Sequence, residues 1–168
     1  AVEHDTMDTT FRSMYLGLSA FLDANTERRE LLLGQRPPCF DSSFDEAIAQ
    51  AGDDFERVAL KAQAARDYFL LVGPPGTGKT SRALRRMVEH FYATSSMQIL
   101  LLAYTNRAVD EICQSLSSIT SGIDYIRVGS ELSCDVRFRG HLLENILAEC
   151  NSRREVNIRM ADCRVYVG

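Results

Sequence analysis

The chain has 168 residues, of which 45% are hydrophobic and 25% are charged, and its formal net charge is −4. This length and composition fit one globular domain, or one domain with a helical appendage. They argue against a membrane-spanning protein, because no apolar stretch approaches the length of a bilayer crossing. The acidic start, with Glu3, Asp5 and Asp8, is unlike a signal peptide. We therefore expect a cytoplasmic protein without membrane contact.

Helical periodicity dominates the N-terminal part. Between residues 10 and 24, apolar side chains recur on one helix face, which we expect to pack into a core. A second short helix is predicted at 26–33, where Gly34 and then Pro37-Pro38 stop it. After an extended connector at 39–43, a third helix is predicted with Asp53 as its N-cap.

The most specific motif is Gly73-Pro74-Pro75-Gly76-Thr77-Gly78-Lys79-Thr80. The apolar run at 68–72 predicts a buried strand before it, and the periodicity of 81–92 predicts a helix after it. A strand, a glycine-rich loop and a helix in this order are the context in which G-x-x-x-x-G-K-[ST] binds a nucleoside triphosphate. The alternative, a glycine-rich turn with a solvated lysine, is disfavoured by that context.

Each residue type in this loop has a chemical reason to be there. Glycines let backbone N–H groups converge on phosphate oxygens, and the helix N-terminus adds its partial positive charge. Lys79 would reach the β- and γ-phosphates, and the Thr80 hydroxyl would hold Mg²⁺, so both are predicted catalytic residues. The cofactors expected are ATP and Mg. The predicted cofactor-binding residues are Gly73, Pro74, Pro75, Gly76, Thr77, Gly78, Lys79, Thr80 and Ser81.

Beyond the loop, strands and helices alternate. The pattern predicts strands at 98–103, 124–128 and 163–167, and helices at 108–116, 141–150 and 153–161. Near-continuous apolar strands are typical of a parallel sheet that is covered on both faces, so we expect an α/β fold. The five cysteines form no C-x-x-C pair and indicate reduced thiols: Cys39, Cys113, Cys134, Cys150 and Cys163.

A second informative segment follows the predicted strand at 98–103. It reads Ala103-Tyr104-Thr105-Asn106-Arg107-Ala108-Val109-Asp110-Glu111-Ile112. Thr105 or Asn106 can cap the helix that starts here, and capping alone would explain both residues.

The loop at 73–80 and the turn at 103–109 resemble the first two motifs of the superfamily 1 helicases. The subgroup is the one that includes the nonsense-mediated-decay RNA helicase and the nuclease-helicase of Okazaki-fragment processing. Residues 66–72 are similar to the DNA-acting nuclease-helicase branch, and residues 27–40 to the helical stalk before its motor domain.

This resemblance implies a RecA-like P-loop NTPase core with a mostly parallel sheet, preceded by a helical stalk. It implies a stalk or linker at 1–52 and a first motor domain at 53–168 that stops before the Walker B motif. A second RecA-like domain is expected beyond residue 168. The intact protein would be an ATP-dependent helicase whose partner is single-stranded nucleic acid, DNA rather than RNA. Thr105 and Asn106 would contact that strand.

Two features depart from the family pattern. The family reads adenine with a glutamine upstream of the loop, but Gln63 lies too close to Gly73 and is interpreted as an ordinary helix residue. No apolar run ending in Asp-Glu follows the loop, because Asp110-Glu111 falls on a predicted helix. The basic residues Arg82, Arg85 and Arg86 indicate a solvated helix face. Two alternatives stay open: another P-loop ATPase, such as an AAA-type remodeller, or a nucleotide-binding or interaction module without turnover.

Overall fold

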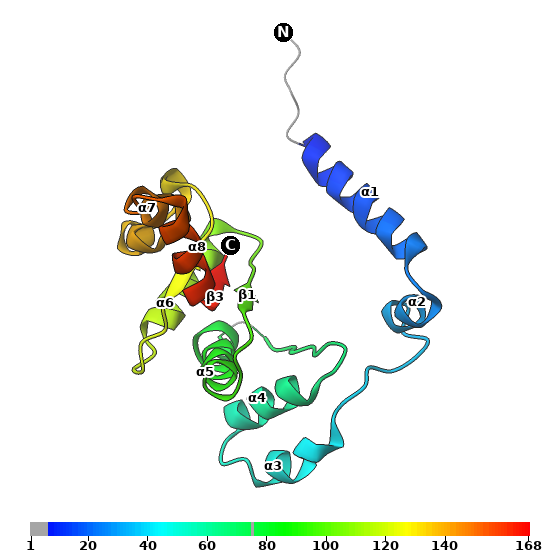
Figure 1. Cartoon of the computed structure of the whole chain (residues 1–168). Coiled ribbons are helices and arrows are strands. Elements are labelled where there is room, and N and C mark those ends of the chain that lie inside the picture. The colour runs from blue at the N-terminus through cyan, green and yellow to red at the C-terminus, as the bar shows by residue number, and fades with distance from the viewer. Residues whose placement is uncertain (1–6, 75) are drawn as a thin grey trace. The chain divides into compact units, whose positions relative to one another are not determined.

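The computed structural model describes residues 7–74 and 76–168. It contains two compact units, of which the first ends at Phe40 and the second is Asp41–Gly168 (Figure 1). None of the helices formed by the described residues has the length and apolarity that crossing a membrane requires.

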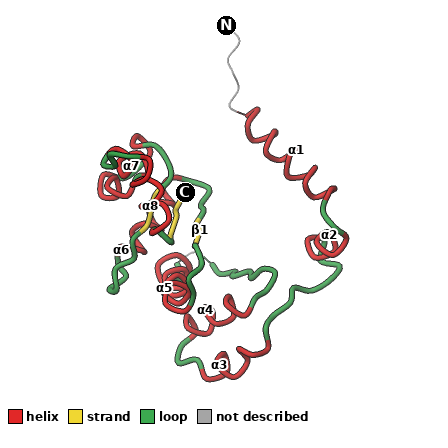
Figure 2. Tube along the Cα trace, in the orientation of Figure 1, coloured by secondary structure: helices red, strands yellow, loops and turns green. Residues whose placement is uncertain are grey.

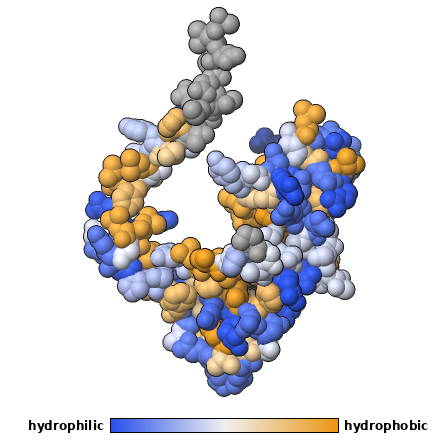
Figure 3. All heavy atoms as spheres, turned by 180° about the vertical axis from the view of Figure 1, so that it is seen from behind, coloured by the Kyte–Doolittle hydropathy of each residue, from blue (hydrophilic) through white to orange (hydrophobic). Residues whose placement is uncertain are grey.

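The first unit holds two helices, α1 (Met7–Asp23) and α2 (Thr26–Leu32), so both helix predictions are confirmed. The Asn25 side chain caps α2 by accepting a hydrogen bond from the backbone N–H of Arg28 at 2.8 Å. The prediction that α1 packs into a core is wrong within this unit. Its apolar side chains are exposed, as the orange spheres along this unit show (Figure 3). The seven-residue α2 offers too little apolar surface to cover them, and it buries only Leu31.

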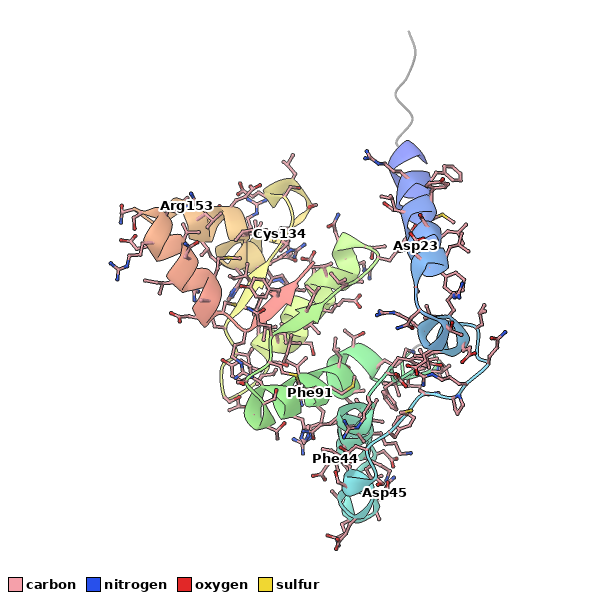
Figure 4. All side chains as sticks on the ribbon, turned by 45° about the vertical axis from the view of Figure 1, so that its right-hand side comes forward. Asp23, Phe44, Asp45, Phe91, Cys134 and Arg153 are labelled. Atoms are coloured by element: carbon pink, nitrogen blue, oxygen red, sulfur yellow. The ribbon has the colours of Figure 1, made fainter. Side chains whose placement is uncertain are left out.

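The second unit opens with a 3₁₀ helix, η1 (Ser42–Phe44), and two helices, α3 (Asp45–Gln50) and α4 (Asp54–Ala64). Figure 4 labels Phe44 and Asp45, where η1 passes into α3. Asp53 caps α4 by accepting from the backbone N–H of Glu56 at 2.7 Å, as predicted. The compact unit thus begins earlier in the chain than the predicted motor domain.

Three parallel strands form the sheet: β1 (Ile99–Leu101), β2 (Tyr125–Arg127) and β3 (Val165–Val167). Their order is β1-β3-β2, and Tyr166 lies opposite Leu100 on one side and Ile126 on the other. The three strands predicted beyond the loop are confirmed, although each is shorter than its predicted range. Parallel strands end at the same edge of a sheet, which places the turn after β1 at the carboxyl edge, where open α/β sheets bind ligands.

The predicted strand at 68–72 is wrong. This segment is a loop in the structure (Figure 2), and the side chains of Leu70 and Val72 are 74% and 92% exposed. A strand needs a neighbour that pairs with its backbone N–H and C=O groups. Among the described residues, none of the three strands pairs with this segment.

Helices pack against the sheet, but Leu100 of β1 is 63% exposed, so the predicted cover on both faces is incomplete at this strand. A π-helix, η2 (Lys79–Leu84), continues directly into α5 (Arg85–Thr94), and α6 (Asn106–Ser117) follows β1. Between β2 and β3 lie the short helices η3 (Glu131–Ser133), η4 (Val136–His141), α7 (Leu143–Ala148) and α8 (Arg153–Asp162). The helix predictions for 81–92, 108–116, 141–150 and 153–161 are confirmed.

The main core joins these helices to the sheet. Val88 of α5, Ile112 and Leu116 of α6 and Phe138 of η4 pack with buried residues of the strands, such as Val165. Cys134, labelled in Figure 4, belongs to the same core. Helices packed on a small parallel sheet are a partial α/β P-loop NTPase fold, preceded in the chain by helices.

Candidate nucleotide-binding site

The loop before η2 has the backbone that a phosphate cradle requires. Gly76 and Gly78 have φ values of 80° and 79°, in the left-handed region where a side chain would be strained. A Cβ added at Gly73 would lie 3.0 Å from Oγ1 of Thr77, too close without a shift of that side chain. Gly76 and Gly78 are therefore needed for the loop's shape, which fits a loop whose backbone must approach phosphate closely.

The helix that follows the loop, η2, begins without a side-chain cap from the described residues. The carbonyl oxygen of Gly78 accepts hydrogen bonds from the N–H groups of Arg82 and Ala83, both at 2.9 Å. No side chain of the described residues caps this end, so the first-turn amides, including those of Lys79 and Thr80, have no partner of their own within the helix. They carry the positive end of the helix dipole, which favours an anion at this point.

Lys79 lies folded back across the loop. Its ammonium donates to the carbonyl oxygens of Gly73 and Pro74, the latter at 2.8 Å. The Thr77 hydroxyl also donates to the Pro74 carbonyl, at 2.8 Å. A phosphate that binds Lys79 must replace these carbonyl contacts, which are neutral acceptors and weaker partners than a charged phosphate oxygen.

The loop opens into a cavity of about 740 Å³. The predicted residues from Gly76 to Ser81 line this cavity. Gly73 and Pro74 do not line it, and their carbonyls accept from Lys79. Pro75 lies outside the described residues. The hydroxyls of Thr80 and Ser81 have no hydrogen-bond partner in the described part of the chain. Both are therefore free to contact Mg²⁺ or phosphate.

The rest of the cavity wall was not predicted. It consists of Arg82 from η2, Arg85 from α5, and four residues from α6: Glu111, Gln114, Ser115 and Ser118. Ser115 donates from Oγ to the backbone carbonyl of Thr80 at 3.0 Å and so joins α6 to the loop. The arginines were interpreted as a solvated face, and their spacing gave no signal of the cavity. The α6 residues lie more than thirty positions after the loop at 73–80, so only the tertiary fold identifies them as part of the site.

Two acidic residues near the site behave differently. Asp110 is bound by the guanidinium of Arg127, whose side chain is only 1% exposed, and also accepts from the backbone N–H of Asp135 at 3.4 Å. Asp110 is therefore a structural partner of β2 and is not available to a metal. Glu111 lines the cavity and lies 3.7 Å from Arg107 in an exposed ion pair.

Gln63 is engaged away from the cavity. Its amide oxygen contacts Nε2 of His90, and its amide nitrogen donates to Oγ1 of Thr94 at 3.4 Å. Both polar groups of the side chain thus join α4 to α5. This supports the interpretation of Gln63 as an ordinary helix residue.

His90 gives this helix contact a pH dependence. Burial lowers the pKa of His90, Arg86 lowers it further, and Glu56 opposes the shift more weakly. The unfolded chain then takes up the proton first, so stability is full above the ordinary histidine pKa of about 6.5 and falls as pH decreases below it. We expect the melting temperature to fall between pH 7 and pH 5, and less so in His90→Gln. Equal falls in the two proteins would contradict this role.

The two polar residues of the turn after β1, Thr105 and Asn106, have different structural roles. Thr105 is the N-cap of α6, because its hydroxyl accepts from the backbone N–H of Ala108 at 3.2 Å. Asn106 is the first helical residue, is exposed, and has no side-chain partner among the described residues. Capping was open to either residue in the sequence, and the structure assigns it to Thr105.

A family model described as an AAA domain matches residues 50–162, which is more than half of the chain. A DNA replication ATP-dependent helicase/nuclease of Arabidopsis thaliana is 33% identical over 138 residues, covering 76% of this chain and 10% of the relative. A DNA replication ATP-dependent helicase/nuclease of Bos taurus is 32% identical over 118 residues, covering 63% of this chain and 11% of the relative. The chain belongs to the superfamily 1 helicases. An RNA helicase of Mus musculus is 30% identical over 90 residues, covering 52% of this chain and 7% of the relative.

Within this helicase family, the chain corresponds to the N-terminal part of the motor. It spans only about a tenth of the length of the two replication helicases, as the covered shares of 10% and 11% show. The AAA-type remodeller is not favoured, because these relatives are named as helicases. The relatives' names include both DNA and RNA helicases.

Proposed function

We propose that the chain is the ATP-binding part of an ATP-dependent helicase motor that moves along a single strand, DNA rather than RNA. The observation that carries this proposal is the cavity that Lys79 and Thr80 share at an uncapped helix start. The preference for DNA rests on relatives named for DNA replication, such as the two that cover 76% and 63% of the chain.

In this proposal, residues 73–81 hold the triphosphate. The first-turn amides and Lys79 would bind phosphate oxygens, the Thr80 hydroxyl would hold Mg²⁺, and Ser81 would add a further hydroxyl. Bound Mg²⁺ would neutralise charge that develops on the phosphates. Binding would move the Lys79 ammonium from the carbonyls of Gly73 and Pro74 to the ligand.

The remaining parts of the motor are also proposals. Residues 1–52 would form a stalk and 53–168 the first motor domain, with a second RecA-like domain and the Walker B acids elsewhere in the full-length protein. Closure of the two domains on ATP would step the turn after β1 along the strand. A cytoplasmic location agrees with five cysteines that form no disulfide among the described residues.

Thr105 and Asn106 provide the test of strand contact, since the two side chains have different structural roles. Removing the cap in Thr105→Ala should cost about 1 kcal/mol of unfolding free energy. Asn106→Ala should leave stability unchanged, because its side chain supports nothing among the described residues. It should weaken single-strand binding about tenfold for every sequence, the effect of one hydrogen bond to a charged phosphate.

Melting temperature and oligonucleotide affinity at fixed salt, measured on the full-length protein, distinguish these effects. Asn157→Ala is the matched control, because Asn157 is an exposed helical asparagine on α8. If Asn106→Ala binds the strand as tightly as this control does, Asn106 is not part of the nucleic-acid interface.

A further inference from the structure

We infer that Ser115 of α6 is the positioning residue that links nucleotide binding at the loop at 73–81 to single-strand binding at the turn after β1. The inference rests on the proposed function, because it assumes that each of the two sites holds the ligand proposed for it. It deepens that function by naming the side chain through which one ligand would alter the affinity for the other.

The Ser115 hydroxyl makes its hydrogen bond outside its own helix. A serine within a helix commonly donates to the carbonyl four residues earlier, as Ser117 does to Cys113 at 3.0 Å. Ser115 instead donates to the backbone carbonyl of Thr80, 35 positions earlier in the chain, at 3.0 Å. Because Ser115 is only 7% exposed, this bond is a contact between α6 and η2 for which water competes little.

The Thr80 end of this bond lies where the nucleotide would bind. The hydroxyl of Thr80 would hold Mg²⁺, and its amide belongs to the first turn of η2, while its carbonyl accepts from Ser115. This turn is not a regular α-helical one, because the Gly78 carbonyl accepts from the N–H groups of both Arg82 and Ala83 at 2.9 Å. Irregular turns of this kind are frequent at functional sites. A phosphate that reorders the turn would therefore displace the carbonyl that Ser115 binds.

Helix α6 carries this contact near one end and the turn after β1 at the other. Asn106 is its first residue, and Ser115 lies about 14 Å further along, at about 1.5 Å per residue. The buried side chains of Val109, Ile112 and Leu116 hold one face of the helix in the main core. A helix packed in this way moves as one rigid element, so a displacement at Ser115 reaches Asn106.

The middle of α6 is anchored to β2. The carboxylate of Asp110 binds the buried guanidinium of Arg127 and accepts from the backbone N–H of Asp135 at 3.4 Å. Asp110 lies between Asn106 and Ser115 on the helix. A shift of Ser115 would therefore tilt α6 about this anchor and change the position of Asn106 at the other end.

The test is the affinity of the full-length protein for a non-hydrolysable Mg-ATP analogue, with and without a saturating single-stranded thymidine oligonucleotide. We expect the strand to change the wild-type nucleotide affinity at least about fivefold, and the nucleotide to change the strand affinity by the same factor, because linkage is reciprocal. In Ser115→Ala both factors should fall close to unity. Each factor is a ratio within one variant, so a uniform change in its nucleotide affinity cancels.

Ser117→Ala is the matched control. It removes a serine hydroxyl from the same helix, but this hydroxyl donates within α6 and Ser117 does not line the cavity. The control should keep the wild-type factors, and melting temperatures check that both variants fold. If Ser115→Ala does not fold, Ser115→Cys replaces it with the same expected loss of linkage, since a thiol is of similar size but is a weak donor.

Two failures are distinguishable. A folded Ser115→Ala or Ser115→Cys that keeps the wild-type factors overturns the role of Ser115 and leaves both binding sites standing. The same holds for an equal loss in Ser117→Ala, and for a wild type in which neither ligand changes the affinity for the other. A wild type that binds no nucleotide or no strand overturns the proposed function, and the role of Ser115 with it.

Discussion

Lys79→Ala is expected to lower the affinity for Mg-ATP at least tenfold. A hydrogen bond from an ammonium to a charged phosphate is worth about 1.5–3 kcal/mol. Part of the full interaction is offset, because Lys79 first leaves the carbonyls of Gly73 and Pro74. Those carbonyls then have no ammonium in the variant, but they lie in an exposed loop where water can bind them.

Titration of a fluorescent ATP analogue into both proteins measures this effect. Lys61→Ala is a matched control, because Lys61 is the only other lysine of the sequence and is exposed on α4, outside the cavity. We expect the control to bind as the wild type does. Equal affinities of Lys79→Ala and Lys61→Ala would remove Lys79 from the site.

The chain alone is expected to bind ATP but to hydrolyse it at least ~10³-fold more slowly than a complete motor, because the absence of an arginine finger alone can cost ~10³–10⁵ in rate. Phosphoryl transfer also needs a carboxylate on Mg²⁺ and a group that positions water. Among the described residues, the nearby Asp110 is bound to Arg127, and the carboxylate that lines the cavity, Glu111, is paired with Arg107.

The release of phosphate from ATP, measured with the 168-residue chain alone, checks this expectation. Turnover near 1 s⁻¹, within the usual enzyme range of about 1–10³ s⁻¹, would contradict it. Glu111→Gln would then be the first variant to measure, because Glu111 lines the cavity. Loss of that turnover in Glu111→Gln would identify Glu111 as an acid that supports hydrolysis.

Local signals predicted most of the elements. Asp53 and the turn at Thr105 were recognisable because a capping side chain acts within three residues of the helix start. The strand β1 follows from an apolar run, part of which the core buries. The run at 68–72 has the same composition and still forms a loop, because pairing depends on a neighbouring strand and not on the run itself.

Only the part of the site formed by consecutive residues could be predicted from the sequence. The motif at 73–80 specifies a phosphate loop through glycine conformations and one lysine, all within a few residues. The other wall comes from α6, and no periodicity indicates that Ser115 meets Thr80 or that Gln114 faces the same cavity. Likewise, the contact of Gln63 with His90 crosses from α4 to α5, so its engagement could not be inferred from the spacing to Gly73.

ATP hydrolysis by the full-length protein, measured with and without a single-stranded oligonucleotide at fixed salt, tests the helicase motor most directly. The account predicts that single-stranded DNA stimulates hydrolysis, that duplex DNA of the same length stimulates it less, and that Lys79→Ala abolishes the stimulated rate. Hydrolysis that persists at one rate with no strand, with DNA and with RNA would contradict a motor coupled to nucleic acid.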